Sequence, residues 1–246
     1  MPSLDAAQWA VALFAVFLVG FSKTGVSGAG TVGVALLALV LPAKLSTGVL
    51  LPLLLVGDAV AVAAYRRHAD WGRLVRLFPW VVVGVLLGAV VVDRVDDVRM
   101  RQLIGALLLS MLAVHWWIRR RGPEDPVARH RAVAASTGVL AGFATMTANA
   151  AGPVMSLYFL AVGLPMLGFL GTGAWFFLLL NAFKVPFSVA LGLITPATLA
   201  FGAMAAPAVL AGAAAGRATV SRISPKVFER VTVALTLLAA VRLVTV

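Results

Sequence analysis

Apolar runs of membrane-spanning length recur along the whole chain and are separated only by short polar segments. The sequence is 62% hydrophobic and 12% charged, whereas a soluble domain carries about 25% charged residues. Inside a bilayer the backbone must satisfy its own hydrogen bonds, and apolar runs of about 20 residues do so as helices. We therefore predict an all-α polytopic membrane protein.

The positive charge of the chain indicates membrane topology rather than nucleic-acid binding. The net charge is +11, but the cations lie in short loops between the apolar runs. Thirteen of the 20 Lys and Arg residues lie in segments 66–76, 119–131 and 217–230. The positive-inside rule places these three segments in the cytoplasm, which predicts that both chain termini lie outside. The chain has no Cys, so neither disulfides nor thiolate metal ligands are available.

A glycine-rich break interrupts the first apolar stretch at Gly20-Phe-Ser-Lys-Thr-Gly-Val-Ser-Gly-Ala-Gly30. Its apolar flanks, 9–19 and 31–41, are each shorter than the roughly 20 residues that cross a bilayer. Glycine permits irregular backbone, and such backbone at membrane depth is tolerated only against protein or a water-filled cavity. We therefore predict a broken or re-entrant helix pair that carries a binding site. Its candidate substrate-binding residues are Ser22, Lys23, Thr24, Gly25 and Gly28.

The second half of the chain repeats the order of these features. Gly142-Phe143 stands 122 positions after Gly20-Phe21, and a second break follows it between 144 and 153. Asn181 stands 123 positions after Asp58 in the next long apolar run. This order indicates an internal duplication.

We predict two repeats, 1–118 and 132–246, joined by a cytoplasmic linker at 119–131. Each repeat is expected to contain one broken helix pair and three transmembrane helices. Because this gives an odd number of crossings, the second repeat is inverted relative to the first. Inverted repeats are typical of secondary transporters, whose substrate sites lie near the midplane at the repeat interface.

Two isolated lysines lie inside apolar segments, where a charge costs about 2.5–3.5 kcal/mol on the insertion scale. Lys23 lies within the first break, and Lys184 lies one helical turn after Asn181. Either lysine could instead extend toward a membrane interface, as long cationic side chains do near helix ends. We favour the interpretation that Lys23, Lys184 and Asn181 belong to one anion site.

Asp58 and Asn149 each allow two interpretations. Asp58 either neutralises one of the intramembrane lysines or carries a proton for coupling. Asn149 lies in the second break, where it either contacts the substrate or satisfies unwound backbone. The sequence leaves both choices open.

Several motifs together point to a known family. They are the glycine-rich break, Leu50-Leu-Pro-Leu-Leu-Leu-Val-Gly-Asp58, Arg66-Arg-His-Ala-Asp-Trp71, Thr147-Ala-Asn-Ala-Ala-Gly-Pro153 and Gly171-Thr-Gly-Ala-Trp-Phe-Phe-Leu-Leu-Leu-Asn-Ala-Phe-Lys-Val-Pro186. Over nearly the whole chain they resemble the sulfite exporter TauE/SafE family. The resemblance implies a multi-pass permease of the bacterial cell membrane that moves sulfite, sulfonates or related small anions. Many members carry consecutive glycines in both breaks, and Asn149-Ala-Ala-Gly152 departs from that pattern.

The residues therefore favour a secondary transporter for a small oxyanion, and the resemblance implies that this is a sulfur-containing one such as sulfite or an organosulfonate. The helices that resume near Thr31 and after Pro153 would point their positive N-terminal ends at the anion. The expected partners are this anion and the lipid bilayer, without nucleic acid, metal or cofactor. Proton coupling and a homodimer stay open.

Two other function classes compete with transport. One is a selective anion channel. The other is an intramembrane enzyme acting on a lipid-linked phosphate, although the membrane segments hold one carboxylate and no arginine cluster to serve it. No Gly-x-x-x-x-Gly-Lys-Ser/Thr motif is present, which argues against an ATP-driven pump formed by this chain.

Overall fold

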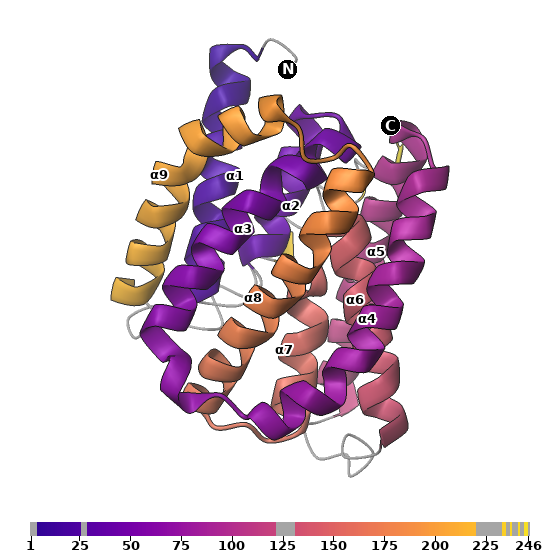
Figure 1. The fold of residues 1–246 in the computed structure, drawn as a ribbon, viewed down its shortest axis with the longest axis vertical. Coiled ribbons are helices and arrows are strands. Elements are labelled where there is room, and N and C mark those ends of the chain that lie inside the picture. The colour runs from indigo at the N-terminus through magenta and orange to yellow at the C-terminus, as the bar shows by residue number, and fades with distance from the viewer. Residues whose placement is uncertain are drawn as a thin grey trace.

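The computed structural model describes residues 4–25, 29–121 and 131–219, with a few isolated positions between 233 and 245. The regular structure of these residues is helical throughout (Figure 1). The elements are α1 (Ala6–Thr24), α2 (Ala29–Val40), α3 (Ala43–Tyr65), η1 (Arg66–His68, a 3-10 turn), α4 (Trp71–Arg94), α5 (Asp97–Arg121), α6 (Arg131–Ala148), α7 (Ala151–Ala161), α8 (Met166–Ala190) and α9 (Pro196–Thr219).

Five of the described helices, α1, α3, α4, α8 and α9, are long and apolar enough to cross a membrane. α2 and α6 are shorter apolar helices, and α7 has 11 residues. α5 has 25 residues and carries arginines near both ends. The prediction of an all-helical polytopic membrane protein is confirmed.

Both predicted breaks are present, but each begins later than the sequence indicates. α1 stays helical through Gly20 to Thr24, so its 19 residues are long enough to span and are not a half-length segment. A glycine inside a helix costs only about 1 kcal/mol, which close packing of Gly20 against α9 can offset. α6 continues to Ala148 and α7 begins at Ala151, so Pro153 is the third residue of its helix rather than the first.

The basic segment 66–76 is only partly a loop. α4 begins at Trp71, so residues 71–76 of this segment are helical, and Pro79 lies inside the helix. Asp70 begins the helix as its N-cap, where its side chain accepts a hydrogen bond from the backbone N–H of Arg73 at 3.1 Å. The connection between α3 and α4 is therefore short and tight.

Two helix pairs pack through the same kind of glycine contact. α1 lies beside α9, and α4 lies beside α6, on opposite sides of the molecule (Figure 1). In each pair a Cβ added to a glycine would collide with a backbone carbonyl of the other helix: Gly20 with Val209 and Gly212 with Phe17 in the first pair, Gly142 with Val81 and Gly84 with Val139 in the second. Contacts further apart show that both pairs run parallel: Trp9 with Phe201 and Gly25 with Gly216 in the first pair, and Leu77 with Gly138 and Gly88 with Met146 in the second.

α3 and α8 cross the middle of the molecule between these two pairs (Figure 1). They run antiparallel, because Gly48 near the start of α3 packs against Leu193 just after α8, while Gly171 near the start of α8 packs against Tyr65. The crossing brings the central parts of both helices together, and Asp58 and Asn181 lie there.

Candidate functional site

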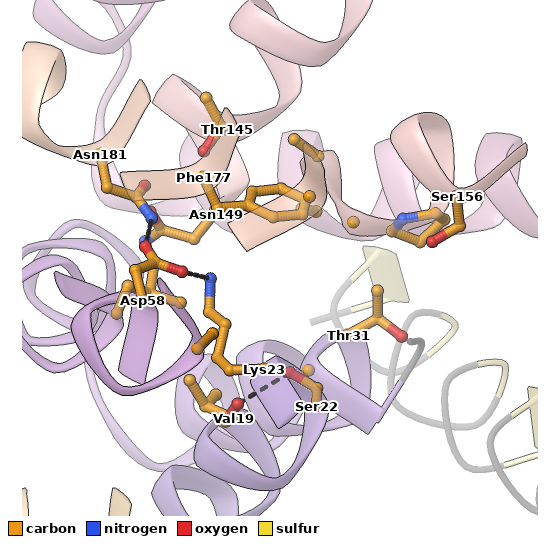
Figure 2. Close-up of a pocket in the computed structure, with 18 of the residues that line it drawn as sticks. Val19, Ser22, Lys23, Thr31, Asp58, Thr145, Asn149, Ser156, Phe177 and Asn181 are labelled. Carbon is orange, nitrogen blue, oxygen red and sulfur yellow. Dashed lines mark hydrogen bonds and ion pairs between the residues drawn. The ribbon is translucent and has the colours of Figure 1, made fainter. Parts of the chain in front are cut away.

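A cavity of about 80 Å³ lies between α1, α2, α3, α8 and the junction of α6 with α7 (Figure 2). A single water occupies about 10–15 Å³ on this measure, so the cavity has room for roughly six waters or one small oxyanion. Its polar lining consists of Ser22, Lys23, Thr31, Asp58, Thr145, Asn149, Ser156 and Asn181. The remaining lining is apolar or glycine.

Lys23 and Asp58 are the ionisable side chains of this lining. Lys23 Nζ lies 2.7 Å from Asp58 Oδ1, and the two side chains are 10% and 1% exposed. The same Nζ lies 4.6 Å from the centroid of the Phe177 ring, within the range of a cation–π contact. The last turn of α1 therefore carries a positive charge into an enclosed space, where α3 and α8 supply its partners.

Asn181 is the second partner of the buried carboxylate. Its Nδ2 donates to Asp58 Oδ2 at 2.6 Å, and Figure 2 shows Asp58 between Lys23 and Asn181. The other amide atom, Asn181 Oδ1, is buried and has no hydrogen-bond partner among the described residues. A buried acceptor without a donor destabilises a protein interior, so we expect Asn181 Oδ1 to accept a hydrogen bond from a water or a ligand.

Lys184 lies behind the cavity wall rather than in the lining. Its Nζ donates to the Thr145 carbonyl oxygen at 2.7 Å, to Thr145 Oγ1 at 3.2 Å and to Asn149 Oδ1 at 2.6 Å. These three acceptors account for the three N–H groups of an ammonium. Thr145 lies in the last turn of α6, whose negative dipole end stabilises the buried cation.

Asn149 holds the second break in its shape. Its φ of 49° is left-handed, a conformation that Asn tolerates better than most residues. Its side chain accepts from Lys184 and donates through Nδ2 to the Thr47 carbonyl oxygen at 3.1 Å. The break between α6 and α7 is thus fastened to both α3 and α8.

Two helices begin at the cavity. Gly30 and Thr31, in the first turn of α2, belong to its lining, and so do 151–153, in the first turn of α7. The first N–H groups of a helix have no partner within the helix, and they carry the positive end of the helix dipole. The cavity therefore combines the Lys23–Asp58 ion pair with two helix starts, whose positive ends add to the potential of the ammonium group.

The structure brings five of the residues singled out from the sequence to the cavity: Ser22, Lys23, Asp58, Asn149 and Asn181. Thr24 and Gly25 instead face α9, where Thr24 Oγ1 donates to the Ala213 carbonyl oxygen at 2.6 Å. Gly28 lies outside the described residues.

The sequence analysis did not single out Thr145 or Phe177. Thr145 stands 122 positions after Lys23, so the repeat offset would have drawn attention to it. Phe177 is one of several aromatic residues in an apolar run, and no local pattern distinguishes it from them. In the described part of the chain, no group of three or more His, Cys, Asp or Glu side chains is placed to hold a metal ion.

The cavity extends further toward one end of the molecule than toward the other. Its lining includes Phe169, Leu170, Gly173 and Ala174 from the first turns of α8. The residues 123 positions earlier, 46, 47, 50 and 51 in α3, are buried and do not line it. The start of α8 packs against the connection between α3 and α4, so the cavity extends toward the end that carries η1.

Comparison with known proteins gives one match. The family model of the sulfite exporter TauE/SafE matches residues 12–243, which is almost the whole chain. Neither the curated proteins nor the solved structures contain a match. Members of the matched family are membrane transporters of sulfur anions and not enzymes, so the interpretation as a lipid-phosphate enzyme is set aside. The chain, a multi-pass helical protein with an enclosed cationic cavity, belongs to the sulfite exporter TauE/SafE family.

Proposed function

We propose that this protein is a secondary transporter that moves sulfite or a small organosulfonate through the cavity beside Lys23. The observation that carries the proposal is an ammonium group, 10% exposed, in a cavity of about 80 Å³ inside the membrane-spanning part of the fold. A charge in that place is costly unless a counter-ion or ligand compensates it, and Asp58 is its counter-ion in the described structure, so a bound anion would take the place of this carboxylate. A small oxyanion matches both the size and the charge.

The proposed site divides the two lysines into different roles. Lys23 contacts the anion directly, because it lines the cavity. Lys184 adds positive potential from behind the wall and keeps Asn149 and Thr145 in position through its three hydrogen bonds. Ser22, Asn149 and Asn181 supply polar contacts, and the first turns of α2 and α7 supply backbone N–H groups.

The two halves, in this proposal, are inverted-topology repeats. Three relationships support this interpretation. First, the glycine contact of α1 with α9 has a counterpart in that of α6 with α4. Second, Asp58 and Asn181, at positions 123 apart, form a hydrogen bond with each other. Third, Gly48 and Gly171, also 123 positions apart, make equivalent close contacts at the two ends of the α3–α8 crossing. Each half thus places its first helix against the fourth helix of the other half.

Alternating access follows from this arrangement. A site shared by two inverted repeats can open to either side when the repeats exchange conformations. In the described structure the lining continues along the start of α8 but not along the start of α3. If segment 66–70 is cytoplasmic, as its cations suggest, this conformation faces inward.

The bacterial cell membrane as the location and a homodimer as the assembly are also part of this proposal. The bacterial cell membrane and a homodimer are both consistent with a multi-pass protein of this family. The linker 119–131 lies largely outside the described residues, and so does most of the chain after 219. Those parts of the predicted repeat boundaries stay predictions.

Flux in proteoliposomes tests the proposed function. Radiolabelled sulfite or a sulfonate is placed outside vesicles that hold the purified protein, with and without a pH gradient. Saturable uptake that a gradient can drive above equilibrium supports a secondary transporter. Flux that only dissipates the anion gradient, unaffected by any coupling gradient, supports the channel alternative, and absence of anion flux refutes both.

A further inference from the structure

In the cavity, Asp58 already occupies the Lys23 ammonium group that a bound anion would contact. Asp58 Oδ1 lies 2.7 Å from Lys23 Nζ, and the carboxylate is almost fully buried. Its second oxygen accepts a hydrogen bond from Asn181. Among the described residues the positive charge of Lys23 is therefore already neutralised inside the protein.

An incoming anion and an ionised Asp58 compete for the same ammonium group. An anion in contact with Lys23 would also lie close to the carboxylate, and two like charges in an enclosed site repel each other strongly. At a separation of about 4 Å and an effective dielectric constant of about 20, this repulsion corresponds to roughly a thousandfold loss of affinity. Asp58 must lose its charge for the anion to bind well.

Asn181 responds to the same proton. An ionised carboxylate can only accept hydrogen bonds, so the amide presents Nδ2 to Asp58, and its Oδ1 is left as the unpartnered acceptor. A protonated Asp58 can donate from Oδ2, and the amide can accept this bond if it turns about its terminal torsion. Because Asn181 belongs to the cavity lining, the turn changes the hydrogen-bonding groups that this residue presents around the carboxyl group.

We propose that one proton on Asp58 opens the site, because it releases Lys23 and turns the Asn181 amide so that a monovalent anion and a proton bind together. This inference rests on the proposed function, since it assumes that the cavity is the anion site. The proton moves from water to Asp58 Oδ2, and the anion takes the place of the carboxylate beside Lys23. The summed charge of Lys23, Asp58 and the anion is then zero with the site loaded, as it was for Lys23 and Asp58 with the site empty.

The other charged groups near Asp58 are accounted for. Lys23 faces it from α1, and Lys184 lies one turn beyond Asn181 on α8. Lys184 Nζ lies within hydrogen-bond distance of three oxygens, a set of acceptors that suits the protonated ammonium form. α9 also packs on α3 and presents Val209 next to Gly57. Among the described cavity residues, Asp58 is thus the group suited to take up the proton.

Proton counting during anion binding tests the switch. Methanesulfonate is a suitable probe because it remains a monoanion from acid to alkaline pH, unlike sulfite. Titration calorimetry of the purified full-length protein in two buffers with different heats of protonation gives the number of protons taken up per anion. We expect uptake to approach one proton at alkaline pH, where the affinity should fall about tenfold per pH unit.

Matched variants separate the switch from a general effect of charge. Asp58→Asn should bind methanesulfonate without proton uptake and with an affinity that does not depend on pH. Asp70→Asn removes a carboxylate in the loop before α4 and should keep the proton uptake of the parent. Asn181→Leu should weaken binding while it keeps the linked proton.

The parent protein alone can already refute the inference. If methanesulfonate binds without proton uptake at every pH, protonation of Asp58 is not linked to anion binding, but the proposed anion site is retained. Proton uptake that persists in Asp58→Asn also overturns it. No binding of methanesulfonate or sulfite at any pH contradicts the proposed function itself. If Asp58→Asn fails to fold, the proton count of the parent still decides.

Discussion

Lys23 Nζ, on α1, lies 2.7 Å from Asp58 Oδ1, on α3. Asn181 of α8 donates a hydrogen bond to the other carboxylate oxygen of Asp58. The hydrogen bond from Asn181 to Asp58 joins the two halves of the chain at the centre of the fold, because Asp58 belongs to the first half and Asn181 to the second. Because it is buried, the ion pair contributes to stability, and in our proposal it also controls anion binding. The two contributions can be separated by experiment.

Removal of one partner of this ion pair should destabilise the protein more than removal of both. Lys23→Met leaves Asp58 as an uncompensated buried charge, which costs about 3–5 kcal/mol of unfolding free energy in comparable pairs. The double variant Lys23→Met with Asp58→Asn removes that penalty and should recover part of the loss. Thermal unfolding in detergent measures both. A double variant that is as unstable as the sum of the singles would show that the ion pair adds nothing.

One added methyl group should destabilise the glycine contacts between α1 and α9 and between α4 and α6. A Cβ at Gly20 or Gly142 would collide with a backbone carbonyl of the neighbouring helix, and backbone cannot move aside as a side chain can. We expect Gly20→Ala and Gly142→Ala each to cost about 1–3 kcal/mol.

Gly202 is the matched control for these substitutions. It is buried in α9, but a Cβ there meets nothing within 4 Å. Gly202→Ala should be neutral or stabilise α9 slightly, since Ala favours helix over Gly by about 1 kcal/mol. Equal melting temperatures for Gly142→Ala and Gly202→Ala would contradict the packing described for α4 and α6.

The sequence predicts the fold class well and the positions of the breaks less well. Apolar runs, loop cations and the repeat offset are local or periodic signals, and they identify the helices and the central polar residues. Where α1 ends depends on Gly20 packing against α9, a contact between residues almost 190 positions apart. Helix propensity along the chain carries no information about such a contact.

The same limit applies to the candidate site. Lys23 and Lys184 both stand out as isolated intramembrane cations, yet only Lys23 lines the cavity. The acceptors of Lys184 include the backbone carbonyl of Thr145, which every residue type possesses. A backbone partner leaves no residue-specific mark, so the sequence indicates that a lysine is buried without indicating what it binds.

Asp70 should contribute to stability in a pH-dependent way. Its side chain accepts hydrogen bonds from the backbone N–H of Arg73 at 3.1 Å and from Arg73 Nε at 2.7 Å. Partial desolvation raises the pKa of the Asp70 carboxyl, but these bonds and the charge of Arg73 outweigh it and hold the pKa below its ordinary value. Because the folded pKa lies below the unfolded one, the contribution is present at neutral pH and is lost as the pH falls through the folded pKa.

Two substitutions test this cap. Asp70→Ala removes the acceptor and should cost about 1 kcal/mol at neutral pH, while Asp70→Asn can still cap the helix. The difference between Asp70→Ala and the parent should shrink in acid, when the parent carboxyl is protonated. A deficit of Asp70→Ala that is the same at acid and neutral pH would argue against the charged cap.

The proposed orientation can be tested with single cysteines, since the parent chain has none. His68 in η1 and Ala197 at the start of α9 are both exposed and lie on opposite sides in the proposed topology. An impermeant thiol reagent added to whole cells should label Ala197→Cys, and it should label His68→Cys only after the membrane is opened. The reverse pattern would invert the scheme.

A second pair of cysteines tests the direction in which the cavity opens. Leu170 lines the cavity, while Thr47, at the equivalent position of the other half, is buried. In inside-out vesicles Leu170→Cys should react with a small thiol reagent faster than Thr47→Cys. Equal reaction rates at the two positions would show that access of the reagent to the cavity does not follow the difference in lining between the start of α8 and the start of α3.

The most direct test of the anion site is the affinity of the purified protein for sulfite or methanesulfonate when single lysines are changed. Lys23→Met should weaken binding by at least about tenfold, the value of one lost hydrogen bond to a charged group, while Lys44→Met, at the start of α3, serves as the control and should not. Lys184→Met should weaken binding through its loss of positive charge and of the Asn149 contact, and its effect should not add to that of Lys23→Met. If a correctly folded Lys23→Met variant binds the anion as tightly as the parent, the site lies elsewhere.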